Sequence, residues 1–107
     1  MADDLVFKAL ADAQRRALLD RLHSRNGQTL SGLCEGLAIT RQAITKHLTV
    51  LEEAGLIVCV WRGREKLHYL NPVPIQEIAD RWISKYEHKR LAALQDLKHA
   101  LEQGDDA

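Results

Sequence analysis

The segment TRQAITKHLTVLEEAGL, residues 40–56, decides the fold of this chain. Thr40 is of a residue type that caps helix N-termini, and Gly55 stands where a left-handed C-terminal cap belongs. The segment therefore predicts a helix over residues 41–54. Its apolar residues recur at i, i+4 and i+7 and form one stripe that is expected to face a core: Ile44, Leu48 and Leu51.

The outward side of this helix is predicted to contact DNA. No acidic residue occurs from residue 38 to residue 51, so nothing there repels phosphate. Arg41 can make two hydrogen bonds to a guanine edge, and Gln42 can do the same with adenine. His47 lies at the edge of the stripe, and two roles fit it equally well. It can donate to a phosphate, or it can hydrogen-bond inside the protein where the helix packs. Phosphate contacts are expected from Thr40, Thr45 and Lys46. The predicted DNA-facing residues of the helix are Thr40, Arg41, Gln42, Thr45, Lys46, His47 and Thr49.

Helical periodicity predicts three shorter helices before this one, up to residue 11, over residues 13–23 and over residues 31–37. The expected N-terminal caps of the first two are Asp3 or Asp4, and Asp12. Residues 38–40 then form a three-residue turn, so residues 31–54 make a helix-turn-helix. In this motif the exposed N-terminal residues of the second helix can meet base edges in the major groove.

The pattern changes after this helix. β-Branched and aromatic residues predict strands over residues 57–61 and 66–70, and Gly63 in their connection makes them a β-hairpin. The cationic side chains around its tip are predicted to reach the minor groove or the phosphates of DNA: Arg62, Arg64 and Lys66. Residues 57–70 therefore form the wing, the second predicted DNA contact.

Residues 74–103 predict one long helix, with Pro74 at a first position that needs no backbone donor. About 30 helical residues span about 45 Å, which is longer than a domain of this size is wide, so part of the helix must project or find a partner. Its apolar residues continue in a shifted phase after Tyr86: Ile75, Ile78, Trp82 and Tyr86, then Leu91, Leu94, Leu97 and Leu101. The order helix, helix, helix, helix, strand, strand, helix is a winged helix-turn-helix. This fold is mainly α with a small β-hairpin (α+β), and residues 1–107 make one such domain.

Charge and cysteine content narrow the functional classes. The chain has 15 basic and 15 acidic residues, so its net charge gives no reason to expect nucleic acid, but residues 41–66 hold five basic against three acidic side chains. Two cysteines are too few for a disulfide framework. No apolar run approaches the length of a membrane span and no basic signal region follows Met1, which predicts a cytoplasmic protein. The sequence has no Gly-rich phosphate loop and no nucleophile elbow, so we expect no enzymatic activity.

Three parts of the chain resemble the ArsR/SmtB family of bacterial repressors: FKALAD and RRALL (residues 7–12 and 15–19), the helix sequence at residues 40–56, and GREKLHYL (residues 63–70). The resemblance implies a homodimer built on the first and last helices, residues 1–11 and 74–103, and repression that an effector relieves. Two-fold symmetry would then match a near-palindromic operator in double-stranded DNA. The dimer-interface residues expected on these helices are Val6, Leu10, Ile78, Trp82, Tyr86 and Leu94.

One metal-binding motif of this family is incomplete here. Metal sensors of the family carry Cys-x-Cys in the third helix, where this chain has Cys34 followed two positions later by Gly36, and one thiolate lacks the ligand count that zinc requires. Cys34 lies beside the inward-facing Leu33, and Cys59 lies in an apolar strand. Both cysteines are therefore expected to be inert buried thiols rather than oxidant sensors.

A second family motif, Asp-x-His-x10-His-x2-Glu on the last helix, is matched only in part. His88, His99 and Glu102 have its spacing, but Tyr86 replaces the aspartate. The match also begins 16 residues after Leu70, whereas the family motif begins close behind the wing. We therefore expect no metal site and no cofactor.

Two functions from different classes fit these observations. The favoured prediction is a sequence-specific DNA-binding transcriptional regulator, a homodimeric repressor that responds to a non-metal or unknown signal. Winged helices also serve as docking domains, so a protein-interaction module without DNA binding is the alternative. In that case the Arg41 face and the wing have no role in DNA binding.

Overall fold

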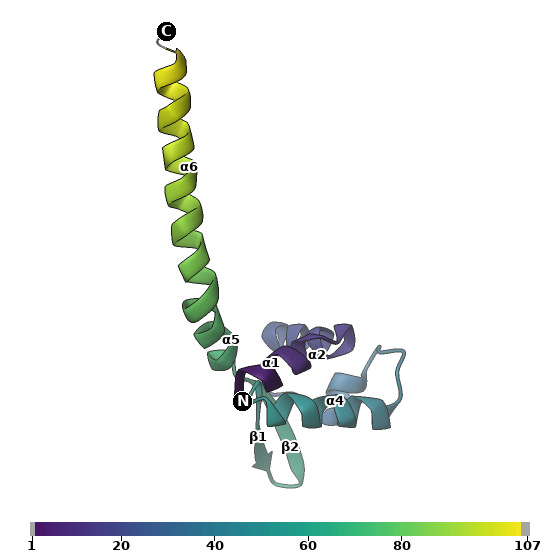
Figure 1. The fold of residues 1–107 in the computed structure, drawn as a ribbon. Coiled ribbons are helices and arrows are strands. Elements are labelled where there is room, and N and C mark those ends of the chain that lie inside the picture. The colour runs from purple at the N-terminus through teal and green to yellow at the C-terminus, as the bar shows by residue number, and fades with distance from the viewer. Residues whose placement is uncertain (1, 106–107) are drawn as a thin grey trace. The chain divides into compact units, whose positions relative to one another are not determined.

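The chain is mostly helical, with one β-hairpin before its last helical segments (Figure 1). The computed structural model describes residues 2–105, and the chain falls into two units divided between Ile75 and Gln76. The first unit holds α1 (Ala2–Leu10), α2 (Ala13–Ser24), α3 (Leu30–Cys34), α4 (Arg41–Glu53), β1 (Ile57–Arg62) and β2 (Glu65–Leu70). The division falls within α5 (Val73–Ile78), and η1 (Ala79–Ile83) and α6 (Ser84–Asp105) follow it. This order confirms the predicted winged helix-turn-helix.

Side chains that accept hydrogen bonds from backbone N–H groups begin the next three helices. Asp12 caps α2 as predicted, with the N–H groups of Gln14 and Arg15 at 2.8 and 3.2 Å. The bond from Arg15 favours the charged carboxylate and lowers the pKa of Asp12. Thr29 and Thr40 cap α3 and α4 in the same way.

Two predictions for α1 are wrong. Asp3 and Asp4 lie in its first turn rather than before it, so neither is its cap. Val6, predicted for a dimer interface, has only 2% of its surface exposed, because this side chain points into the core of its own protomer. It has no area left to bury against a second chain. The exposed large apolar side chains of α1 are Leu5 and Phe7.

The apolar core of the first unit lies between α1, α2, α4 and the hairpin (Figure 1). The predicted stripe of α4 is buried in this core, which confirms its inward orientation. Burying one large aliphatic side chain contributes roughly 1.5–3 kcal/mol, so the roll of α4 about its axis is strongly determined. The largest fully buried side chains are Leu18, Leu22, Leu33, Ile44, Leu51 and Leu56.

The predicted hairpin is present and each strand is one residue longer at the tip. β1 and β2 pair antiparallel, with Arg62 opposite Glu65 and a two-residue turn that begins at Gly63. The φ of Gly63 is +63°, which a type II′ turn needs at this position and glycine adopts without strain. A bridge between Gln28 and His68 holds the loop between α2 and α3 to the other edge of β2.

The helix-turn-helix has a longer connection than predicted. α3 follows its cap Thr29 and ends at Cys34, whereas the sequence predicted a helix over residues 31–37. Residues 35–40 connect it to α4, and Gly36 among them has a φ of +75°. Because a residue in the left-handed region cannot continue an α-helix, α3 ends before Gly36.

The predicted C-terminal helix begins at Val73, one residue before Pro74, and is interrupted by one turn of π-helix, η1. A π turn holds more residues than an α turn, so it rotates the side chains that follow about the helix axis. Since η1 ends before Tyr86, it does not account for the shift in phase between Tyr86 and Leu91, which falls within α6. Trp82 in η1 and Tyr86 in α6 stack, with ring centroids 6.5 Å apart.

The second unit carries exposed apolar side chains on one side of α6. Tyr86, Leu94, Leu97 and Leu101 follow one another at eight, three and four residues, so they lie on the same side of the helix. Each exposes more than half of its surface in the protomer. Ile78 in α5 has only 8% of its surface exposed in the protomer, which leaves little area for its predicted place in a dimer interface. Among the described residues, no helix combines the length and apolar character needed to cross a bilayer.

Replacing Asp12 with alanine is expected to lower the free energy of unfolding at neutral pH, because α2 loses its cap. The folded-state pKa of Asp12 lies below its ordinary value of 3.8, so the stabilisation is present above that pH and is lost as the pH falls through the lowered pKa. Urea denaturation at fixed protein concentration should show the gap between wild type and D12A closing in acid. D12N, which keeps a capping oxygen but does not titrate, is the control. A gap of D12A that is the same at every pH would contradict this account.

Candidate nucleic-acid interface

α4 presents a polar side to solvent because its apolar stripe is turned inward. The exposed residues on this side are Arg41, Gln42, Thr45, Lys46 and Thr49. All five were predicted to face DNA, and the structure brings them together on one helix. His47 is half-buried at the edge of the stripe.

The threonines on this side hydrogen-bond within the helix. Thr40 Oγ1 accepts from the N–H of Ala43 at 3.1 Å, which leaves its own proton able to donate to a phosphate. The hydroxyls of Thr45 and Thr49 donate to the carbonyls four residues earlier, at 2.9 and 3.1 Å. A phosphate oxygen only accepts hydrogen bonds, so the hydroxyl of Thr45 or Thr49 could donate to one only after rotation about a single side-chain bond. All three hydroxyls are thus compatible with phosphate contact.

Arg41 and the wing lie around one surface hollow. This depression has a volume of about 290 Å³ and joins three cationic side chains from two separate segments, together with one carboxylate. Arg62, although exposed at the tip of the wing, lies outside the lining. Clustered cations next to an exposed helix attract a phosphate backbone. The lining residues are Thr29, Leu30, Ser31, Arg41, Arg64, Glu65 and Lys66.

His47 joins α4 to α2. Its Nε2 donates to Gln14 Oε1 at 2.9 Å, and its Nδ1 accepts from Arg15 Nη1 at 3.2 Å. Arg15 in turn donates to the carbonyls of Lys8 and Ala9 near the end of α1, both at 2.8 Å. Both ring nitrogens of His47 are therefore engaged inside the protomer. Of the two roles open for this residue, the geometry supports packing.

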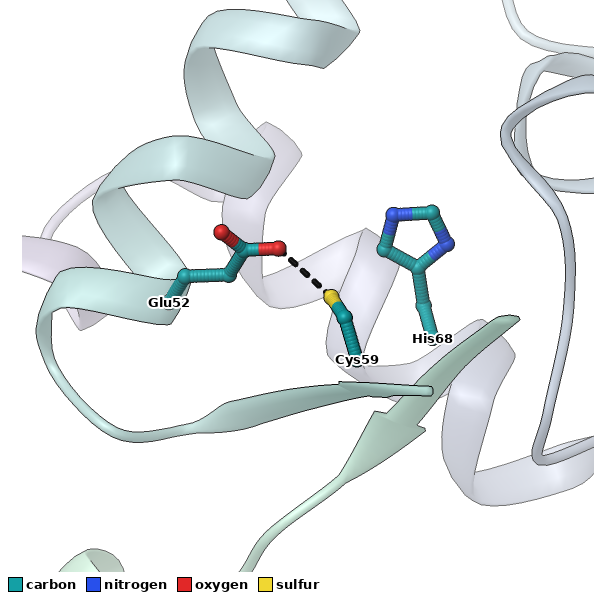
Figure 2. Close-up of side chains that lie close together, drawn as sticks. All are labelled: Glu52, Cys59 and His68. Carbon is teal, nitrogen blue, oxygen red and sulfur yellow. Dashed lines mark hydrogen bonds between the residues drawn. The ribbon is translucent and has the colours of Figure 1, made fainter. Parts of the chain in front are cut away.

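Glu52, Cys59 and His68 form a cluster that joins α4 to the wing (Figure 2). Cys59 lies opposite His68 in the strand register, so both side chains are on the same face of the hairpin. The Cys59 thiol donates to Glu52 Oε1 at 2.5 Å, and Lys66 Nζ lies 3.2 Å from the same oxygen. A pocket of about 180 Å³ opens beside the cluster, lined by Leu30, Thr45, Leu48, Thr49, Glu52, Lys66 and His68.

These contacts set the ionisation of two groups. Partial burial raises the pKa of Glu52, but the hydrogen bonds from Cys59 and Lys66 outweigh it and leave this pKa below the ordinary value of 4.5. Burial, followed by the bond to Glu52, raises the pKa of Cys59 to about 11. Cys59 is therefore protonated at neutral pH and is a poor nucleophile. The predicted burial of the cysteines is wrong, because Cys34 and Cys59 are both only partly buried.

Sequence reasoning missed this cluster and the partners of His47. A short turn at Gly63 makes Cys59 and His68 equidistant from the hairpin tip, so their pairing was available from the sequence. The approach of Glu52 depends on how α4 packs against β1, and no local pattern encodes that packing. The contact of His47 with Gln14 spans 33 residues and is equally invisible to periodicity.

Known proteins resemble this chain over most of its length. A helix-turn-helix domain family matches residues 10–60. The uncharacterized HTH-type transcriptional regulator YuzN of Bacillus subtilis is 43% identical over 86 residues, which cover 75% of this chain and 94% of that protein. The transcriptional repressor SdpR of the same organism is 30% identical over 84 residues, covering 78% of this chain and 91% of that protein. Among solved structures, an ArsR-like transcriptional regulator from Rhodococcus sp. RHA1 is similar with a TM-score of 0.71 and 34% identity, over 90% of this chain and 92% of that one.

Replacing His47 with alanine is expected to lower the free energy of unfolding by roughly 1–3 kcal/mol, because two hydrogen bonds between α4 and α2 are lost. K46A, a neighbouring change on the exposed side, is the matched control and should alter stability by less than about 0.5 kcal/mol. Urea denaturation at equal protein concentration measures both. If H47A is as stable as the wild type, the ring is not a packing group and a phosphate contact is the role that remains.

Proposed function

Because this chain belongs to the ArsR/SmtB-type family of winged helix-turn-helix transcriptional regulators, we propose that it binds an operator as a homodimer through α4 and the wing. The observation that carries the proposal is the hollow in which Arg41 of α4 meets Arg64 and Lys66 of the wing. An exposed helix and a cationic ribbon on one surface can engage a groove and its bordering phosphates together. A repressing role is proposed because SdpR, the similar protein from Bacillus subtilis, is a transcriptional repressor.

The N-terminal turn of α4 is assigned to base reading. Arg41 and Gln42 are exposed at the start of the helix and can each make paired hydrogen bonds, to guanine and to adenine respectively. The remaining contacts hold phosphates or the minor groove and set the register of the protein on the duplex. These positioning contacts are assigned to Thr40, Thr45, Lys46, Thr49, Arg62, Arg64 and Lys66. His47 is assigned to the packing of α4 on α2.

The homodimer is proposed to form through the exposed apolar side of the second unit. Trp82, Tyr86 and Leu94 each leave about half of their surface exposed in the protomer. Burying such side chains against a second copy removes apolar area from water, which favours association. Two-fold symmetry would then present two copies of α4 to half-sites about 34–36 Å apart in a near-palindromic operator.

The proposal gives the chain a binding role and no reaction of its own. The geometry favours DNA over a protein partner, because cationic side chains converge beside the exposed face of α4. No Asp or Glu occurs from residue 38 to residue 51 to repel phosphate. Since its target is DNA, we place the protein in the cytoplasm.

Arg41→Ala is expected to weaken binding to the operator by about 1–3 kcal/mol and to relax base preference at one position of each half-site. Mobility shifts with a duplex from the region upstream of its own coding sequence, against a scrambled duplex of equal length, measure both effects. K8A removes an exposed cation outside α4 and the wing and is the matched control. An equal loss of affinity for both duplexes would indicate that Arg41 contacts a phosphate rather than a base. Absence of any shift with the wild-type protein at low salt would contradict DNA binding itself.

Trp82→Glu is expected to shift the protein toward the monomer, because the dimer would have to bury a charge without a partner. Sedimentation velocity over a range of concentrations measures the change. Gln95→Glu is the control, since residue 95 lies nine positions after Tyr86 and therefore on the other side of α6. A sedimentation profile of W82E that matches the wild type would place Trp82 outside the interface.

A further inference from the structure

Three side chains that can bind a metal ion converge where α4 meets the wing. One ligand atom from each of Glu52, Cys59 and His68 lies within 4.8 Å of the other two (Figure 2). The three residues come from α4, β1 and β2, so the set is assembled by packing rather than by a motif along one helix. A tetrahedral zinc ion with bonds of about 2.0–2.3 Å holds its ligand atoms about 3.5 Å apart. A side-chain movement of roughly 1 Å therefore brings the set to bonding distance.

The surroundings of His68 prepare its ring for a metal. Its Nδ1 lies 2.9 Å from the carbonyl oxygen of Gln28, and because a carbonyl only accepts, Nδ1 carries the proton. The backbone bridge between the same two residues and the low exposure of His68, 4%, hold the ring in place. The lone pair of the neutral ring is then on Nε2, which lies on the side toward Cys59 and Glu52 in Figure 2. Metal-bound histidines are oriented by this kind of second hydrogen bond.

We propose that Glu52, Cys59 and His68 bind a zinc-like divalent ion, with water as the fourth ligand on the side of the pocket of about 180 Å³. Zinc takes carboxylate, thiolate and imidazole ligands, and three protein ligands with one water form an open zinc site. The thiolate selects against magnesium and calcium, which prefer oxygen alone. On binding, the Cys59 thiol releases its proton to solvent, and Sγ bonds the ion in place of its hydrogen bond to Glu52.

This site is separate from both of the incomplete metal-binding motifs that the chain shares with the family. Cys34 is the last residue of α3, and Gly36 follows in the connection to α4. His99 and Glu102 lie in α6. The proposed site instead shares its pocket with Thr45, Thr49 and Lys66, which are on the surface assigned to DNA.

A consequence for DNA binding rests on the proposed function. Without the ion, the cluster has a charge of −1 from the Glu52 carboxylate, with the thiol and the neutral ring uncharged. With a divalent ion, the carboxylate and the thiolate bring the sum to zero, so the DNA-facing surface gains one positive unit. The ion also competes with Lys66 for Glu52, which frees the ammonium group for phosphate. Zinc should therefore strengthen DNA binding, and DNA should strengthen zinc binding by the same factor.

The site itself is tested without DNA. One equivalent of Co²⁺ added to the reduced wild-type protein should produce a thiolate-to-metal charge-transfer absorption, which an equivalent of Zn²⁺ displaces. C59S should lose this absorption, and C34S, the matched control for the other cysteine, should keep it. E52Q keeps the size of the side chain and should weaken Co²⁺ binding by more than about 10-fold. Loss of a residue that only hydrogen-bonds to a metal ligand already lowers metal affinity by about this factor, and a direct ligand should contribute more. Circular dichroism of each variant separates loss of metal binding from loss of fold.

The proposal is overturned if the wild-type protein gives no charge-transfer absorption, or if C59S keeps it. The DNA arm is measured separately, as the affinity for the upstream duplex with Zn²⁺ or with a chelator, and at least about 5-fold tighter binding is expected with Zn²⁺ in the wild type but not in C59S. A Cys59-dependent Co²⁺ signal in a protein that never shifts DNA would support the site and contradict the proposed function. Equal DNA affinity with and without Zn²⁺ would overturn the coupling alone.

Discussion

The burial of one side of α4 is the constraint on which the rest of this structure depends. Isolated helices of about this length are marginal in water, so α4 exists because Ile44, Leu48 and Leu51 are removed from water against α1, α2 and the hairpin. Since these three side chains occupy the core, the roll of the helix is determined. The polar side, beginning with Arg41 and Gln42, then faces solvent without any further device. Core packing in this way selects the residues that can meet DNA.

The side chains that flank the stripe determine what α4 is attached to. His47 follows Ile44 by three residues and Glu52 follows Leu48 by four, which places them on opposite flanks of the buried side. His47 hydrogen-bonds to α2, whereas Glu52 contacts Cys59 and Lys66 of the hairpin. The helix is thus held to the body on one flank and to the wing on the other. Glu52 therefore contributes to holding the wing against α4.

Local patterns predicted the elements well because each pattern reports one local force. Apolar spacing located α4, Asp12 and Thr40 located helix starts, and Gly63 located the hairpin turn. The errors came where tertiary packing decides. Val6 satisfies a helical pattern whether it faces its own core or a second chain, and periodicity along one helix cannot distinguish the two. The Glu52 cluster and the bonds of His47 join residues from different elements, so their existence follows from how helices and hairpin meet rather than from any spacing.

The exposed apolar side of α6 gives the last helical segment a need for a partner. Tyr86, Leu94, Leu97 and Leu101 all lie in α6, after η1, so their common side follows from their α-helical spacing. All four are exposed in the protomer. A helix that leaves so much apolar area in water gains most of its stability from whatever covers that side. In the proposed dimer, α6 of a second chain covers this side. The stability of α6 then depends on protein concentration, as does the pairing of two α4 helices on one duplex.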